Sequence, residues 1–155
     1  MVRPLVAIAV AIALSLQLAS AQQIPSGKLL VAAAKSHDPD LAQSVVLLIH
    51  SDKDGAIGLI LNRPIKDVYF GGPVALGARC LFRSRTKPNF GEHVFADVYV
   101  ATKPVDKGRV YAGYVGWSAA QLQDEVSRGL WQVRDATAAL VFDPNPATEW
   151  RRLLR

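Results

Sequence analysis

The chain has little cysteine and histidine, and this scarcity argues against several classes of site. Its one cysteine, Cys80, cannot form an intramolecular disulfide. His37 flanks a turn and His50 ends an apolar run, so neither shares a helix face with a second ligand. A zinc site needs three or four ligands at matched spacing. We therefore expect no metal site and no bound cofactor.

The motifs that usually mark catalysis or phosphate binding are also missing. The sequence has no Gly-x-Gly-x-x-Gly, Walker A or Gly-x-Ser-x-Gly pattern. Residues 52–55, Asp-Lys-Asp-Gly, resemble half of a calcium loop but lack the later bidentate glutamate. Neighbouring arginines could activate Cys80, yet no histidine is identifiable as its base. We predict no enzymatic activity and no catalytic residue.

Only one apolar run is long enough to suggest targeting. Arg3 precedes an apolar stretch at 5–16, and Ala19-Ser20-Ala21 has the small-x-small form of a cleavage site. Residues 1–21 therefore read as a secretory signal peptide, and 22–155 as one exported domain, periplasmic or secreted. The alternative is an uncleaved membrane anchor at the N-terminus. No segment after the signal is expected to span a membrane.

Acidic residues are fewer than basic ones, 13 against 18, which gives a net charge of +5. This balance suits contact with an anionic surface or partner. Four basic residues cluster without an acid among them, at Arg79, Arg83, Arg85 and Lys87. With Phe82 and Phe90 interleaved, this segment could follow a nucleic-acid backbone and stack bases. The alternative is a solvated basic loop beside two core aromatic residues.

Short apolar or alternating segments predict a protein built mainly of strands. Asp54-Gly55 predicts a hairpin turn, and Gly58 a bulge or a close backbone approach. Gly71-Gly72-Pro73 predicts a second tight turn, while 75–92 is mixed and basic, with no strand assigned. The strands expected are 28–34, 44–50, 56–61, 94–100, 109–115, 131–134 and 138–142.

One helix is clearly indicated after this series of strands. Ser118 and Gln121 have the spacing of a capping box, and Gly129 supplies a C-terminal stop. Asp124 and Arg128 form a favourable i,i+4 pair between them. A second short helix is expected after Asn145-Pro146. Strands with helices inserted late in the chain indicate an α+β fold.

Several motifs stand in the order found in the YqgE/AlgH family of bacterial proteins. They are "GKLLVAAAKSHDPDLAQSVVLLIHSDKDGAIGLILNRP" (27–64), "GGPV" (71–74), "GYVGWSAAQLQDEVSRGLW" (113–131) and "LVFDPNPATEWRRLL" (140–154). The chain thus resembles that family over nearly all of the segment after the signal. Family-motif positions in this sequence are Asn62, Pro64, Gly72, Pro73, Gly113, Trp117 and Gln121.

The resemblance implies a single α+β domain of coiled, bent, mostly antiparallel sheets with few helices and no established catalytic activity. Some family members are labelled transcriptional regulators, which makes nucleic-acid binding the alternative to a binding or interaction domain. An exported member would have no chromosome to regulate. The partner expected is thus a protein or an anionic surface. Asn62 and Gln121 are the polar motif positions that could bind it.

This chain departs from the family pattern in several places. The segments 64–71 and 100–109 are shorter than usual, and a helix is expected to be missing from the second. Ala120 replaces the usual glycine and Gln123 the usual glutamate. The family is generally read as cytosolic, so a secretory signal is a further departure.

Overall fold

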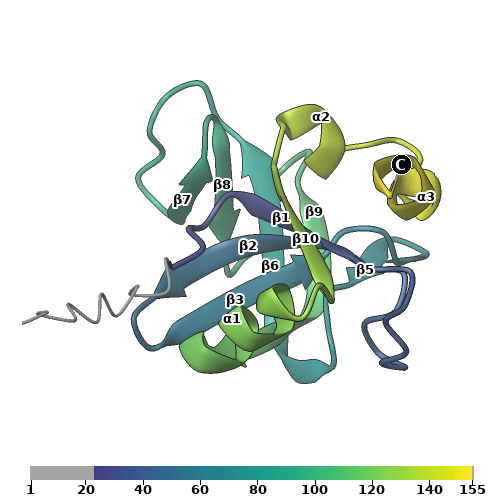
Figure 1. The fold of residues 1–155 in the computed structure, drawn as a ribbon. Helices are drawn as coiled ribbons and strands as arrows, with labels where there is room; N and C mark the ends of the chain where they lie inside the picture. Colours follow the sequence, from purple (N-terminus) through teal and green to yellow (C-terminus); the bar gives the residue numbers. More distant parts are fainter. Residues whose placement is uncertain (1–22, 155) are drawn as a thin grey trace, which may run out of the picture.

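A computed structural model describes residues 23–154, which form one curled sheet with short helices packed on it (Figure 1). The predicted signal peptide, 1–21, lies outside the described residues. No described helix is long and apolar enough to cross a bilayer. The elements are β1 Lys28–Ala32, β2 Val45–Asp52, β3 Gly55–Ile60, β4 Pro64–Ile65, β5 Val68–Phe70, β6 Val74–Arg83, β7 Glu92–Phe95, β8 Val98–Ala101, β9 Arg109–Ser118, α1 Ala119–Ser127, β10 Trp131–Asp135, α2 Ala138–Val141, the 3-10 helix η1 Pro146–Thr148 and α3 Glu149–Leu153.

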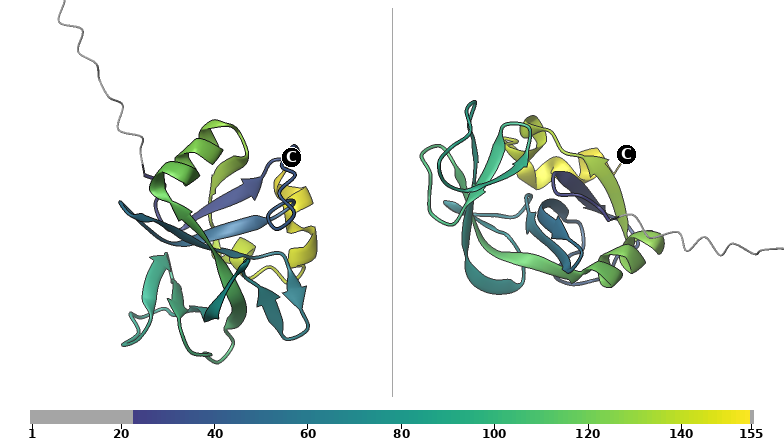
Figure 2. Two further views of the ribbon diagram at one scale, coloured as in Figure 1. Left: turned by 90° about the horizontal axis from the view of Figure 1, so that it is seen from below. Right: turned by 90° about the vertical axis from the view of Figure 1, so that its left-hand side faces the viewer.

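The strands follow the order β10-β1-β2-β3-β9-β6-β8-β7, and neighbours along this path are antiparallel. β4 and β5 form a small hairpin beside it, and β5 pairs in parallel with β9. The sheet bends into a half-barrel (Figure 2). The residue before β1 lies against the far end of the sheet, since a Cβ on Gly27 would lie 2.7 Å from Phe95 Cβ in β7. The predicted α+β class of bent, mostly antiparallel sheet is confirmed.

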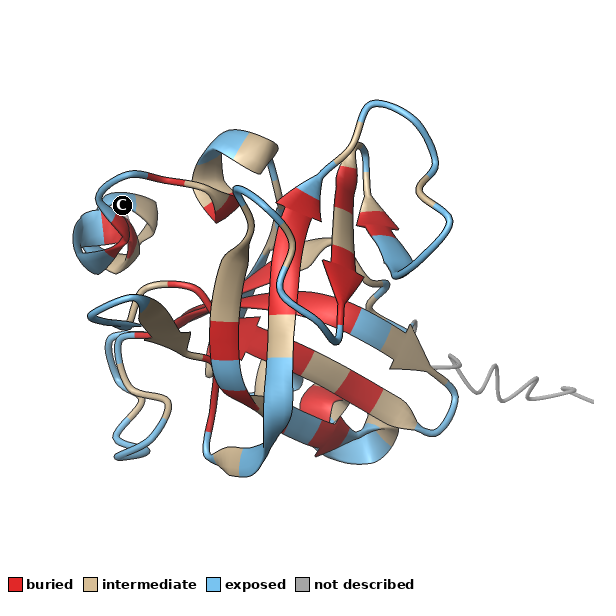
Figure 3. Cartoon of the chain, turned by 180° about the vertical axis from the view of Figure 1, so that it is seen from behind, coloured by how far each residue is buried: buried red, intermediate tan, exposed pale blue. Residues whose placement is uncertain are grey.

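Both faces of β1, β2 and β3 are covered, and each face carries a hydrophobic cluster. The concave cluster joins Leu29 and Leu47 to Leu81 from the far end of the sheet, with α2 and α3 packed against it. The convex cluster joins Leu30 to Leu122 of α1 and to Trp131. Burial on both faces explains the continuous apolar runs at 29–32 in β1 and 45–49 in β2, which do not alternate with polar residues (Figure 3).

The hairpin predicted from Asp54-Gly55 is present, with Lys53 and Asp54 as its two turn residues between β2 and β3. Gly58 has no room for a side chain, because a Cβ there would lie 2.4 Å from Val46 Cγ1. The group that approaches Gly58 most closely is thus a side chain, and of the two predicted alternatives the bulge is present, in the opposing strand β2 between Leu48 and His50.

A bulge in β2 changes which side chains face the concave side. Leu48 pairs with Gly58, but the next pair is His50 with Ile57, so Ile49 is the extra residue. Ile49 belongs to the concave cluster, and Ile57 packs against it. Directly opposed residues in a sheet share a face. The bulge therefore turns His50 toward the concave side, where simple alternation would have pointed it outward.

The prediction of a tight turn at 71–73 is wrong, because this segment is a close crossing of two backbones. Gly71 accepts a hydrogen bond from the N–H of Ile60 and donates to the carbonyl of Ala112, so it joins β3 to β9. A Cβ on Gly72 would lie 2.2 Å from the carbonyl carbon of Tyr114. Gly113 has φ of +75°, and a Cβ there would meet the Gly72 carbonyl oxygen at 2.4 Å.

Two segments in the middle of the chain also differ from expectation. The mixed, basic stretch contains the ten-residue strand β6, which pairs with β8 and β9. The single strand expected over 94–100 is a hairpin of β7 and β8, turning at Ala96 with φ of +45° and Asp97. The alternation of side chains continues through this two-residue turn, so periodicity alone does not reveal it.

The strand expected over 138–142 is also wrong, because this segment forms helix α2. The Thr137 side chain caps it by accepting a hydrogen bond from the N–H of Leu140 at 3.2 Å. A short apolar run does not distinguish a strand from a buried helical turn. The hydrogen bond from Leu140 to the Thr137 side chain is the local feature that favours a helix here.

Candidate functional site

Asn62 fastens the loop that precedes β2. Its Oδ1 accepts from the N–H of Val45 at 2.9 Å, and its Nδ2 donates to the carbonyl of Gln43 at 2.8 Å. Arg63 donates to two further carbonyls of the same loop, those of Asp40 and Ala42. The polar groups of Asn62 are thus engaged within the protein. The neighbouring motif residues Pro64, at the start of β4, and Pro73, before β6, are exposed.

Helix α1 begins and ends as predicted. Ser118 Oγ accepts from the N–H of Gln121 at 3.1 Å, and Gly129 has φ of +71° just beyond the helix. The return half of the capping box is absent, because the Gln121 side chain donates to Glu125 Oε1 at 3.4 Å instead. The i,i+4 ion pair of Asp124 and Arg128 is present at 3.4 Å.

Glu125 also holds two tryptophans together. Its Oε2 accepts from Trp117 Nε1 at 2.7 Å and from Trp131 Nε1 at 2.9 Å. The two indole rings meet edge to face, with centroids 5.9 Å apart. Trp117 and Gln121 therefore lie in one network that fixes α1 to the convex face. A binding role for Gln121 stays a prediction.

The four basic residues of the predicted patch have different surroundings. Arg83, at the end of β6, forms an ion pair with Asp97 of the β7–β8 turn, with nitrogen and oxygen 2.8 Å apart. Arg85 and Lys87 are exposed on the loop that follows β6. Arg79 lies over the Tyr114 ring, with its guanidinium carbon 4.6 Å from the ring centroid. In the β6–β9 register Arg79 pairs with Tyr111 of the concave cluster, so it faces the concave side of the sheet. Arg83 shares this face but lies at the end of β6, where it is held in its ion pair.

Arg79 borders a groove of about 780 Å³ at the open side of the half-barrel, which we call the mouth groove. One wall comes from the β2–β3 hairpin, and the other from β6, β8 and the segment before β7. Its volume falls within the range of about 300–1,000 Å³ typical of small-molecule sites. The apolar lining residues are Ile49, Ile57, Phe90, Val100 and Ala101, and the polar ones are His50, Arg79, Glu92, Thr102 and Lys103, with Gly91 between them.

The register of the sheet brings the cations of the mouth groove to one end. Cys80 pairs with Ala101, so Arg79, one residue earlier in β6, lies beside Thr102 and Lys103 at the end of β8. Among the described residues, neither Arg79 nor Lys103 forms an ion pair with a carboxylate. Their charges are thus available to a ligand at this end of the groove.

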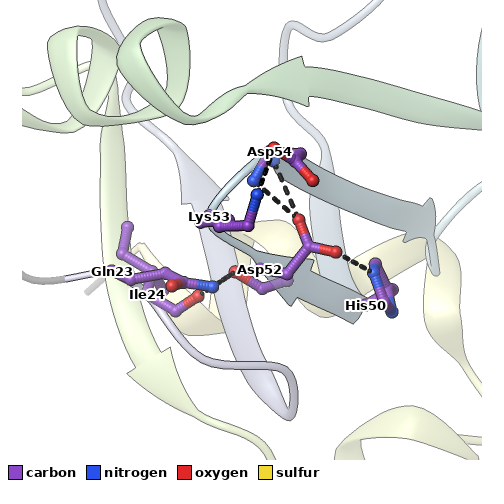
Figure 4. A network of polar contacts seen from close by, with 8 residues as sticks. Gln23, Ile24, His50, Asp52, Lys53 and Asp54 are labelled. Atoms are coloured by element: carbon purple, nitrogen blue, oxygen red, sulfur yellow. Dashed lines mark hydrogen bonds and ion pairs between the residues drawn. The ribbon is translucent and has the colours of Figure 1, made fainter.

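His50 enters the mouth groove from the opposite wall, held by the hairpin turn (Figure 4). Its Nε2 lies 2.9 Å from Asp52 Oδ2, and Asp52 Oδ1 accepts from the N–H groups of Asp54 and Gly55. The hydrogen bond with His50, followed by those from the turn, lowers the pKa of Asp52. The same carboxylate therefore fixes both the turn and the imidazole.

A second group of ionisable residues lies under the C-terminal helices. Glu149 of α3 is fully buried, and neither carboxyl oxygen has a hydrogen-bond partner among the described residues. Burial and the charge of nearby Asp143 raise the pKa of Glu149 to about 7. Burial opposes ionisation of Asp143 as well, but the hydrogen bonds from Arg152 and from the N–H of Asn145 outweigh it and lower that pKa.

Tyr111 and Arg109 of β9 complete this buried group. The Tyr111 hydroxyl is buried without a hydrogen-bond partner among the described residues, and burial raises its pKa. Arg109 donates to the carbonyl of Asp143 at 2.6 Å and lies over the Tyr69 ring. These contacts tie the C-terminal segment to the concave core. The buried carboxyl of Glu149 was not foreseen from the sequence, where it appears as one acid in a charged helix.

Cys80 lies on the opposite face of β6 from Arg79 and Arg83, because side chains alternate along a strand. It is 1% exposed, and its sulfur accepts from the N–H of Val105 at 3.4 Å. Arg79 and Arg83, although near Cys80 in the sequence, therefore do not point at the thiol.

The described residues contain no group of three or more His, Cys, Asp or Glu side chains arranged to hold a metal ion.

Comparison with known proteins identifies relatives along almost the whole chain. A UPF0301 protein of Streptomyces avermitilis is 32% identical over 165 aligned positions, which cover 84% of this chain and 85% of the relative. A UPF0301 protein of Thermobifida fusca is also 32% identical, over 169 positions covering 84% and 85%. The first alignment takes in about 130 residues of this chain (84% of 155), so about 35 positions have no counterpart here.

Two solved structures share the fold. A crystal structure of a Corynebacterium diphtheriae protein matches with a TM-score of 0.76 at 20% identity, covering 86% of this chain and 87% of that one. The solution structure of the AlgH protein from Pseudomonas aeruginosa matches with a TM-score of 0.69 at 25% identity, covering 82% and 85%. A family model described as AlgH-like matches residues 29–155. The chain therefore belongs to the AlgH-like family, as its motifs predicted.

Proposed function

We propose that this chain is an exported, non-enzymatic binding domain that takes an anionic ligand in the mouth groove. The observation that carries the proposal is the meeting of Arg79, Lys103 and His50 around one concave site. Arg79 and Lys103 are not committed to carboxylates among the described residues. A concave site with a few convergent polar groups is the usual form of a ligand-binding pocket.

The electrostatics of the groove support an anion. Arg79 and Lys103 contribute two positive charges, and Glu92 contributes one negative charge, while Asp52 is paired with His50. Stacking on Tyr114 holds the Arg79 guanidinium in place, so less side-chain entropy is lost when a ligand binds.

The test is a titration of the isotope-labelled protein with inorganic phosphate, followed by amide chemical shifts. We expect the largest shifts at Arg79, Thr102 and Lys103, and no comparable shifts with chloride at matched ionic strength. Residues of β10, on the far edge of the sheet, serve as the internal reference. Shifts that are absent, or spread evenly over the surface, would contradict anion binding in the groove.

Export rests on the signal-like pattern of residues 1–21. Cell fractionation with N-terminal sequencing tests it. We expect the protein outside the cytosol, beginning at Gln22. A cytosolic protein that retains Met1 would contradict export and leave the groove proposal to be judged by its own titration.

The alternative is a regulator that binds nucleic acid through the basic patch. The structure of the patch gives this alternative less support, because Arg83 is paired with Asp97 and Arg79 faces the concave side. Binding to duplex DNA at low salt, falling steeply as salt rises, would favour the regulator. We expect no such binding.

A further inference from the structure

We infer that the mouth groove binds an aliphatic carboxylate, a monoanion with an unbranched apolar tail, with its head at Arg79 and its tail along Val100 and Ile49. This inference rests on the proposed function, because it names the ligand class for the same site. It depends on how charge and apolar surface are distributed within the groove.

The head group is indicated by the cationic end. Arg79 carries a planar guanidinium that can form two parallel hydrogen bonds to a carboxylate. Thr102, exposed beside it, offers a hydroxyl, and Lys103 adds a second charge. Arg79, Lys103 and Glu92 are the charged lining residues, and together they give the groove a net charge of +1 when His50 is neutral. A monoanion balances this charge.

The tail is indicated by the rest of the lining. Val100 lies two residues before Thr102, so both side chains share a face of β8 and its extension. Ile49 and Ile57 form the opposite wall, and the β2 bulge is what brings Ile49 and His50 to the same side. An apolar path therefore begins directly beside the cationic end.

Two features set the orientation of the ligand. Glu92 pairs with Val100 in the β7–β8 register, so the single acid stands beyond the cations, beside the apolar path. It repels a carboxylate there and favours the head at Arg79. Phe90, which also lines the groove, is 51% exposed and stacks on Phe82 with ring centroids 5.5 Å apart, so it offers further apolar surface to the tail.

The experiment is calorimetric titration of the purified full-length protein with butyrate, hexanoate, octanoate and decanoate, each below its micelle concentration. Each buried methylene contributes about 0.8 kcal/mol, so affinity should rise about tenfold for every two methylene groups until the groove is filled. Heptyltrimethylammonium has the same seven-carbon tail as octanoate with the opposite charge and should not bind. Arg79→Gln should weaken octanoate binding by about tenfold or more, because a charge-assisted pair is lost.

Arg83→Gln is the matched control. Arg83 lies on the same strand and the same face as Arg79, but pairs with Asp97 outside the groove. This variant should bind octanoate as the wild type does. Arg79→Lys, which keeps the charge and loses the two-pronged geometry, should fall between the wild type and Arg79→Gln. If wild type, Arg79→Gln, Arg79→Lys and Arg83→Gln all bind octanoate with equal affinity, Arg79 does not hold the carboxylate and the inference is overturned.

The outcomes separate the inference from the proposed function. Affinity that depends on Arg79 but not on chain length would overturn the aliphatic tail and leave anion binding standing. Binding only to phosphatidylglycerol vesicles, or only to a peptide with a free C-terminal carboxylate, would replace the small ligand by a macromolecular one and overturn the inference. If neither the carboxylates nor inorganic phosphate bind, both the inference and the proposed function fall.

Discussion

The buried carboxyl of Glu149 makes the stability of this protein depend on pH in a specific direction. Its pKa is raised from 4.5 to about 7 in the folded state. Below pH 4.5 the group is protonated in both states. Between pH 4.5 and 7 the unfolded chain releases the proton while the folded chain keeps it, so the free energy of unfolding falls as pH rises. Above pH 7 this loss is complete and amounts to about 3 kcal/mol.

Replacing Glu149 by glutamine removes this titration. The free energy of unfolding of Glu149→Gln, relative to wild type, should therefore increase by about 2–3 kcal/mol between pH 5 and pH 8. Urea unfolding at both pH values measures it, with fluorescence of the buried Trp117 and Trp131 as the probe. Asp143, whose pKa is lowered, stays ionised between pH 5 and pH 8 in both proteins, so its own titration does not contribute to the difference.

The control is Glu92→Gln, which makes the same substitution at an exposed glutamate, so that an effect specific to Glu149→Gln reports the buried carboxyl. Parallel curves for Glu149→Gln and wild type between pH 5 and pH 8 would refute the reasoning. They would mean that Glu149 reaches water or a partner in solution and titrates like an exposed acid.

Three further predictions concern the family motifs, each measured by urea unfolding. Asn62→Ala removes two hydrogen bonds that fasten the loop before β2 and should cost about 1–3 kcal/mol, whereas a cost near zero would show that the loop is held by other contacts. Glu125→Ala leaves two buried indole N–H groups without their acceptor and should cost about 2–4 kcal/mol; Glu125→Gln, which keeps one acceptor oxygen, should cost less, and the reverse order would contradict the network. Gly113→Ala and Gly77→Ala change residues of nearly equal φ, +75° and +71°, but only at Gly113 would the new Cβ meet a neighbouring backbone oxygen at 2.4 Å. Both should therefore cost about 1 kcal/mol for the left-handed backbone, with a further penalty only at Gly113, and equal costs would refute the close crossing.

Features set by neighbouring residues could be predicted from the sequence. The Ser118 cap, the stop at Gly129 and the hairpin at Asp54-Gly55 each depend on groups within a few residues of one another. The strand assignments of β1 and β2 follow from the continuous apolar runs at 29–32 and 45–49, which are buried on both faces. Family motifs then supplied the bent antiparallel sheet, which local patterns do not specify.

Features set by distant contacts could not be predicted. β6 combines exposed and basic residues with buried ones, because only part of it lies under neighbouring elements. The turn at Ala96 and Asp97 keeps the alternation of a single strand. The segment at 138–142 is apolar enough for either structure, and the Thr137 cap determines the helix.

The same limit applies to the candidate site. The sequence places Arg79 in a basic patch, but its stacking on Tyr114 and its position beside Lys103 depend on strand register. In the sequence His50 ends an apolar strand, and only the bulge turns it into the mouth groove. The basic cluster in the sequence therefore contains one residue of the groove, Arg79. The other lining residues come close to it only because the sheet is curled.

The most direct test of the ligand site is a crystal structure of the protein with 8-bromooctanoate, in which anomalous scattering locates the bromine. We predict the carboxylate on the Arg79 guanidinium and the bromine within the mouth groove, on the apolar path lined by Val100 and Ile49. A bromine peak elsewhere on the surface, or a carboxylate bound away from Arg79, would contradict the account.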